Sequence, residues 1–297
     1  MTLKTPKCLI CNSEAFTPFL EVPNRFNILE SYMLVQCSAC GFVYLWPIPE
    51  EMEKYYEDAA YQPHQEKAET FTDRLYRWVR AWNLNTKRRL IKKYHKDGLL
   101  LDYGCGTGAF LSHMKNAGWS VQGVEPSEKA RSVGVQNDLN VQTDIDQVSG
   151  SFDVITLWHV LEHIENAHEV IDSLSRKLTP DGILVIAVPN RDSLDAKVYK
   201  SHWVAFDAPR HLYHFRTQDM VRFFETHRLR IVSKHTLCFD TWFNALLSCQ
   251  MESAVLRKRF YAFGLIKSGF IALGASFRGA FHVDSGSSLV YIVKCLL

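Results

Sequence analysis

The sequence lacks an excess of either charge, because 34 lysines and arginines stand against 32 aspartates and glutamates, a net charge of +2 over 297 residues. A chain this close to neutral has no overall attraction for nucleic acid. It also lacks a recognisable secretory signal, since Met1–Pro6 leads directly into a cysteine pair. We therefore expect a cytoplasmic protein with reduced thiols, in which closely spaced cysteines indicate metal binding rather than disulfides.

Long apolar runs are also missing. The most apolar stretch, residues 260–277, is shorter than the about 20 residues that a spanning helix needs, and it contains Lys267. Three basic residues, 257–259, precede it. A helix lying on a membrane surface over residues 255–280 is one interpretation, and a packed lid or a dimer surface is the other. We expect residues 240–287 as a whole to form a helical insertion.

Cysteines at close spacing are present near the N-terminus. Cys8 and Cys11 form one C-x-x-C pair, and Cys37 and Cys40 form a second pair 25 residues later. Two such turns can aim four thiolates at one point, which is the tetrahedral shell that zinc prefers. Four cysteine ligands leave no open position for catalysis, so we predict a structural zinc in a ribbon-like module at residues 1–48. A redox role is the alternative, although two pairs argue against it.

The chain between this module and the main domain is expected to be a helical linker or cap over residues 49–96. Residues 49–56 suit a short helix, and residues 66–94 carry apolar side chains near helical spacing together with many basic ones. A basic helix can meet RNA or anionic lipid. More often it presents a solvated face over a packed apolar one.

The strongest pattern in the sequence is residues 99–111, which fit a buried strand, a glycine turn and the start of a helix. Glycines permit positive φ and let a ligand approach the backbone, and the helix N-terminus offers free N–H groups. Gly104 and Gly106 begin both the dinucleotide pattern G-x-G-x-x-G/A, completed by Ala109, and the tighter G-x-G-x-G, completed by Gly108. The glycines alone leave the choice of cofactor open.

An acid in front of the glycines, Asp102, favours the tighter pattern. With it, the stretch resembles the first motif of class I S-adenosylmethionine-dependent methyltransferases. The resemblance implies a loop around the methionine part of the cofactor and an acid on the ribose, which Glu125 fits at the expected distance of about 20 residues. A further polar residue, Asp144, is implied at the adenine. The implied cofactor-binding residues are Asp102, Gly104, Cys105, Gly106, Gly108, Glu125, Pro126, Asp144, Trp158 and His159.

The rest of the chain alternates strands and helices, as a parallel α/β sheet requires. We predict a Rossmann-like sheet of seven strands within a methyltransferase domain at residues 97–297. After the first strand, the expected strands are residues 119–124, 139–142, 151–157, 182–188, 229–236 and 288–295. The resemblance implies that the last two strands are antiparallel and that the last strand lies beside the fifth.

The stretch H-V-L-E-H-I at residues 159–164 follows the fourth predicted strand. It is similar to the post-strand motif of ubiquinone-type O-methyltransferases, which act on small molecules, and it is not the N/D-P-P-Y/F motif of methyltransferases that modify amino nitrogens. His159 and His163, four residues apart, would share one face of a helical turn. That spacing can hold a metal, but no third ligand is obvious, so we favour cofactor contact by Trp158 and His159.

A polar and aromatic loop at residues 202–215 carries the candidate catalytic groups. Its P-R-H-L-x-H-F run resembles a methyltransferase subgroup often found with surface-glycan or lipid-linked sugar biosynthesis. A hydroxyl acceptor loses a proton during methyl transfer, and histidine is the usual side chain for that task. His211 and His214 are the candidate bases, and Arg210 could orient an anionic acceptor. In the alternative interpretation, the loop is a lid whose histidines hydrogen-bond the backbone.

Together these patterns predict methyl transfer from S-adenosylmethionine to a hydroxyl of a small molecule, a sugar or a lipid-linked glycan precursor. An rRNA methyltransferase is an alternative, because some join a zinc module to this fold; the modest charge and missing N-P-P-Y count against a nucleic-acid partner. Sugar C-methyltransferases also carry an N-terminal cysteine-zinc module, usually with a longer C-terminal region. A non-catalytic cofactor-binding module is the third alternative.

Overall fold

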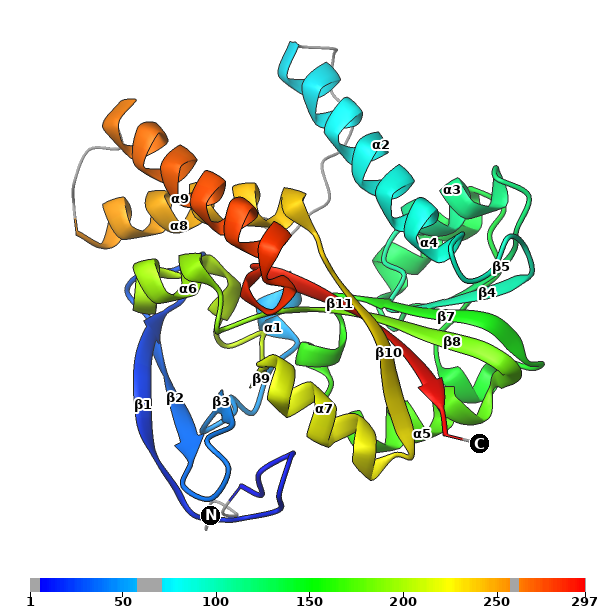
Figure 1. Ribbon diagram of the computed structural model, residues 1–297, viewed down its shortest axis with the longest axis horizontal. Helices are drawn as coiled ribbons and strands as arrows, with labels where there is room; N and C mark the ends of the chain where they lie inside the picture. The colour runs from blue at the N-terminus through cyan, green and yellow to red at the C-terminus, as the bar shows by residue number, and fades with distance from the viewer. Residues whose placement is uncertain (1–5, 58–70, 257–261, 297) are drawn as a thin grey trace.

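The computed structural model describes residues 6–57, 71–256 and 262–296 of the chain (Figure 1). Its main sheet has seven strands in the order β10-β11-β8-β7-β4-β5-β6. The strands are β4 (Leu99–Tyr103), β5 (Ser120–Val124), β6 (Val141–Gln142), β7 (Phe152–Trp158), β8 (Leu178–Pro189), β10 (Leu229–Thr236) and β11 (Ser288–Cys295). The five strands from β6 to β8 run parallel, whereas β11 is antiparallel to both β8 and β10. The predicted Rossmann-like sheet and the place of the last strand are confirmed.

Helices cover both faces of this sheet. The helices are α1 (Lys54–Glu57), α2 (Phe71–Ile91), α3 (Ala109–Lys115), α4 (Glu128–Gln136), α5 (Ala167–Arg176), α6 (Leu194–Tyr199), α7 (Thr217–Thr226), α8 (Cys238–Val255) and α9 (Ala262–Phe281). Successive residues of a strand point to opposite faces. In β4, Leu100 therefore packs in the core that includes α2 and α3, whereas Leu101 packs in the core that includes α5 and α7. Burial on both faces explains why the central strands are nearly continuous apolar runs.

Most element boundaries follow the expectation. The strands β10 and β11 have the predicted ends. Strand β8 starts at Leu178, earlier than predicted, because Leu178 pairs with Phe152 of β7; after a register shift the pairing resumes at Ile183 with Val154. The helix expected over residues 66–94 is α2, and residues 66–70 lie outside the described part of the chain.

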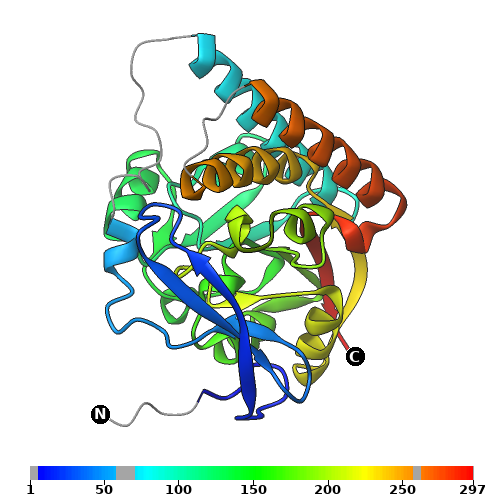
Figure 2. The ribbon, with the colours of Figure 1, turned by 90° about the vertical axis from the view of Figure 1, so that its left-hand side faces the viewer.

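A second sheet joins the N-terminal segment to the main domain. It has four antiparallel strands in the order β1-β2-β3-β9: β1 (Phe16–Pro23), β2 (Ser31–Cys37), β3 (Val43–Leu45) and β9 (Tyr213–His214). Strand β9 comes from the histidine loop, and its His214 pairs with Val43 of β3. The cysteine-bearing segment and the loop of candidate catalytic residues therefore share one sheet, whose N-terminal strands face the viewer in Figure 2.

The region between β10 and β11 is helical, as predicted, and consists mainly of the hairpin of α8 and α9. Figure 1 shows this hairpin and α2 at the same end of the molecule. Within the described residues, no helix has both the length and the hydropathy to cross a membrane.

Candidate functional site

The glycine turn after β4 leaves space for a ligand at one position. Gly104, Gly106 and Gly108 all have positive φ, between 56° and 76°. A Cβ on Gly104 would lie 2.6 Å from a methyl carbon of Val160, so that glycine permits close packing. A Cβ on Gly106 would meet nothing within 4 Å. Gly106 therefore exposes backbone at the carboxyl edge of the sheet, where ligands of open α/β sheets bind.

Glu125, which follows β5, is tied directly to this turn. One oxygen of its carboxylate accepts a hydrogen bond from the N–H of Gly106 at 2.8 Å, and the other accepts one from the N–H of Ser127 at 2.9 Å. Ser127 caps α4. The arrangement fixes a half-buried acid beside the open glycine, and Pro126 lies exposed next to it.

Asp102 supports the turn from below. Its side chain is buried, and the hydroxyl of Thr156 on the neighbouring strand β7 donates to it at 2.5 Å. Burial raises the pKa of Asp102 to about 7, although Thr156 and the ammonium of Lys87 oppose this shift. The thiol of Cys105 is also buried, close to Gly123, and burial raises its pKa.

The end of β7 supplies an aromatic wall. The rings of Trp158 and Phe110 meet edge to face with centroids 5.4 Å apart. The ammonium of Lys87, from α2, lies 4.3 Å from the centre of the Trp158 ring. The indole N–H of Trp158 is buried without a hydrogen-bond partner among the described residues. On the far side of the edge, Asp144 is exposed and accepts from the N–H of Asp146 at 2.9 Å.

His159 lies between two carboxylates. Its Nε2 is 2.8 Å from Asp240 at the start of α8, and its Nδ1 is 3.3 Å from Glu162. Burial alone would lower the pKa of His159, but the hydrogen bonds and ion pairs with these two carboxylates outweigh burial and raise the pKa to about 10. The ring is therefore a half-buried cation that holds α8 against the end of β7.

The expectation that His159 and His163 share a helical face is wrong. His159 has φ of 58° and lies outside the short 3₁₀ turn Leu161–His163. The Nδ1 of His163 instead donates to the carbonyl of Arg210 at 2.9 Å. Burial, with the nearby ring of His211, lowers the pKa of His163 to about 4, which keeps it neutral.

His211 presents one ring nitrogen to a pair of buried carboxylates. Its Nδ1 lies 2.8 Å from the carbonyl of Ala205, which can only accept, so Nδ1 carries a proton. Nε2 lies 4.0 Å from Glu162 and 3.9 Å from Asp207. Glu162 is fully buried, and the neighbouring histidines outweigh that burial and lower the pKa of its carboxyl.

The other two candidate catalytic residues are engaged elsewhere. Arg210 is buried, pairs with Asp207 through Nε at 3.0 Å and through a second short contact, and lies 4.3 Å from the ring centre of Phe26. His214 is buried in β9 against the ring of Phe206, and burial lowers its pKa well below the usual range.

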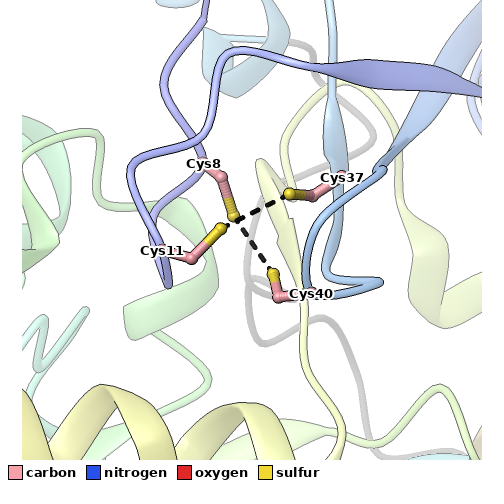
Figure 3. A group of neighbouring side chains, drawn as sticks. All are labelled: Cys8, Cys11, Cys37 and Cys40. Carbon is pink, nitrogen blue, oxygen red and sulfur yellow. Dashed lines mark hydrogen bonds between the residues drawn. The ribbon is translucent and has the colours of Figure 1, made fainter.

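The four N-terminal cysteines converge, although Cys8 and Cys11 come from one turn and Cys37 and Cys40 from another (Figure 3). The Sγ atoms of Cys8 and Cys40 are 3.5 Å apart, as are those of Cys11 and Cys37, and all four lie within 4.8 Å of one another. Zinc–sulfur bonds of about 2.3 Å in a tetrahedron place sulfurs about 3.8 Å apart, so the group fits zinc. Among the described residues, Glu162, His163 and His211 are the other group close enough to hold a metal ion.

Sequence reasoning missed Glu162, Asp207 and Asp240 as members of the site. Glu162 lies inside the quoted H-V-L-E-H-I stretch, and its position between two histidines was a usable signal. Asp240 lies 81 residues from His159 in the chain and carries no local signal. Lys87 appeared only as one of many basic residues of the linker helix.

Comparison with protein families identifies the domain whose sheet carries the glycine turn and the candidate site. A family model described as a methyltransferase domain matches residues 73–234, more than half of the chain. The chain belongs to this methyltransferase family. The match includes the glycine turn, Glu125, the end of β7 and the histidine loop, and it confirms the predicted class of protein.

Several curated proteins are similar to this methyltransferase domain. The C-methyltransferase NovU of Streptomyces niveus is 29% identical over 149 residues, which is 46% of this chain and 34% of that protein. The ubiquinone biosynthesis O-methyltransferase of Actinobacillus pleuropneumoniae is 36% identical over 107 residues, 31% of this chain and 46% of that protein. The chain thus spans about a third to a half of the length of these relatives. The resemblance to ubiquinone-type O-methyltransferases is confirmed.

Solved structures of methyltransferases also align with this chain. A possible histamine N-methyltransferase of Thermotoga maritima aligns with TM-score 0.47 and 15% identity over 75% of this chain and 95% of that one. Magnesium protoporphyrin IX methyltransferase of Synechocystis, solved with bound S-adenosylhomocysteine, gives TM-score 0.45 and 20% identity over 62% and 85%. The fold assignment itself rests on the strand order.

Proposed function

We propose that this protein is an S-adenosylmethionine-dependent methyltransferase that acts on a hydroxyl of a small molecule, a sugar or a lipid-linked glycan precursor. The observation that carries the proposal is the open backbone at Gly106 with the carboxylate of Glu125 fixed beside it. Bound S-adenosylmethionine would supply an activated methyl group. The turn of Gly104, Gly106 and Gly108 would contact the cofactor, Glu125 would face its ribose, and Trp158 would line one side of the site.

His211 is the base in this proposal. In the neutral ring with the proton on Nδ1, its Nε2 is the nitrogen that can take the proton that the acceptor hydroxyl loses. Glu162 and Asp207, both about 4 Å away, would stabilise the resulting imidazolium. His214 has no carboxylate ion pair of this kind within the described residues. We assign Arg210 the role of positioning Asp207, because its guanidinium is already engaged by that carboxylate.

Carbon methylation is the second candidate function. It is suggested by the relative named as a C-methyltransferase, which aligns over 46% of this chain, while ubiquinone-type relatives align over 31% to 64%. A histidine base serves either reaction, because both need a proton removed from the acceptor. RNA methylation would require a basic acceptor surface and a salt-dependent affinity.

For the cysteine cluster we propose a structural zinc bound by Cys8, Cys11, Cys37 and Cys40. The two turns are alike, since the N–H of Asn12 donates to the carbonyl of Cys8 and that of Gly41 donates to the carbonyl of Cys37, both at 2.9 Å. Four thiolates would close the shell, so this ion would take no part in methyl transfer.

The experiment that tests the function uses S-adenosylmethionine with a labelled methyl group and four acceptor pools: small hydroxylated metabolites, nucleotide sugars, polyprenyl-linked glycans and total RNA. The expected result is label in a metabolite or sugar-containing fraction, with magnetic resonance showing the methyl on oxygen. A methyl on carbon would establish the second candidate. Label confined to RNA, or no transfer to any pool by protein that binds the cofactor, would contradict the proposal.

A further inference from the structure

One face of α9 carries large apolar side chains that are open to solvent. Ile266, Phe270, Leu273, Phe277 and Phe281 are between 54% and 71% exposed. They follow one another at intervals of three or four residues, so they lie along a single stripe of the helix. Large apolar side chains that are exposed together along one stripe, rather than scattered singly, indicate an interaction site.

The opposite face of α9 packs against the rest of the protein. Ala272 and Ala275 are buried, and a Cβ on Gly274 would lie 3.3 Å from Leu194 of α6. Lys267 pairs with Glu252 of α8. The helix is thus held on the protein through its small residues, which fixes the aromatic stripe outward on a rigid support.

A second helix adds to the same end of the molecule. Figure 1 shows α2 at the same end of the molecule as the α8–α9 hairpin. Trp78 and Trp82 on α2 are 66% and 42% exposed. Tryptophan and phenylalanine are the side chains that settle at the boundary between lipid headgroups and acyl chains.

Charge decides which partner fits. Exposed arginines flank the apolar side chains, with Arg80 between Trp78 and Trp82 on α2 and Arg278 next to Phe277 on α9. Lys87 and Lys267 are left out of this charge, because they contact Trp158 and Glu252. A second copy of the chain would bring the same positive charge to the contact. An anionic bilayer surface would be attracted instead, at about 1 kcal/mol for each basic residue near it.

We infer that the exposed stripe of α9, with the tryptophans of α2, docks the protein on an anionic membrane surface. The helices lie on the headgroup region and do not cross it. This surface is separate from the proposed chemistry, because none of its residues belongs to the glycine turn or the histidine loop. It is tied to that chemistry through α8, whose Asp240 holds His159.

The test is co-sedimentation of the 297-residue chain, purified with its metal, with vesicles of phosphatidylcholine alone or mixed with phosphatidylglycerol. We expect binding to the mixed vesicles, weakened by added salt. The double variant Phe270→Gln and Phe277→Gln should bind at least about tenfold more weakly, since two aromatic rings no longer leave water. Leu29→Gln, at an exposed apolar residue far along the chain, is the matched control and should bind as the wild type does.

Thermal unfolding and light scattering complete the test. The double variant should unfold at the wild-type temperature, because both substituted side chains are already exposed. Absence of vesicle binding by the wild type, or equal binding by the double variant, would overturn the inference. So would a wild-type dimer that the double variant converts to a monomer without any vesicle binding, because the stripe would then be a self-association surface.

Discussion

Replacement of Asp102 by asparagine should change how the stability of the cofactor-free protein depends on pH. Burial raises the pKa of Asp102 from 3.8 to about 7 in the folded state. Between these values the unfolded chain has released its proton while the folded protein has kept it. The free energy of unfolding therefore falls as pH rises through this window and levels off above pH 7. Asparagine does not titrate, so the variant lacks this fall.

The size of the effect follows from the shift. Each pH unit inside the window costs the wild type about 1.4 kcal/mol. Between pH 5.5 and pH 8.5, the wild type should lose about 2 kcal/mol that Asp102→Asn does not lose. The comparison of two pH values cancels the constant cost of placing an amide beside Thr156, which is the same at both.

Urea unfolding of both proteins at the two pH values measures this difference. The exposed aspartate Asp181 supplies the control, because Asp181→Asn removes a carboxylate of the same type from the surface. Its effect on stability should be small at both pH values. The reasoning is refuted if Asp102→Asn changes the free energy of unfolding by the same amount at pH 5.5 and pH 8.5, since Asp102 would then not titrate in that window.

Two further predictions concern the metal and the base. The purified protein should contain one zinc ion per chain. Cys37→Ser should lose the metal and unfold at a lower temperature, whereas Cys295→Ser, at an exposed free cysteine, should keep the metal and the wild-type unfolding temperature. A Cys37→Ser protein that retains full zinc would contradict the site. His211→Asn keeps a donor near Ala205 but has no Nε2, so kcat should fall about 10²- to 10⁴-fold with unchanged cofactor affinity, while His202→Asn in the same loop should retain activity. An equal fall in both histidine variants would show that the loop is merely sensitive to substitution.

The central strands were predictable because both of their faces are covered, which makes them nearly continuous apolar runs. The strand at residues 229–236 agrees to the residue because its apolar pattern and its turns are local signals. Strands β1 and β2 were not predicted. In β1, Thr17 and Pro18 lie on an exposed edge strand with a register shift, so neither a continuous apolar run nor strict alternation appears in the sequence.

The site divides in the same way. The glycine turn could be predicted from the sequence because its residues are contiguous and backbone geometry imposes their spacing. The cluster around His211 could be predicted only in part, because tertiary packing brings Glu162, Asp207 and His159 together. The pairing of β3 with the two residues of β9 likewise depends on contacts between segments about 170 residues apart.

The most direct measurement is calorimetric titration with S-adenosylmethionine, S-adenosylhomocysteine and NADH. Gly106→Ala and Gly118→Ala form a matched pair, because both glycines have positive φ and open space at Cβ, but only Gly106 lies in the turn after β4. We predict dissociation constants on the order of micromolar for the first two ligands, none for NADH, and weakened binding in Gly106→Ala alone. Binding of NADH alone, or equal losses in both variants, would contradict a cofactor site at this turn.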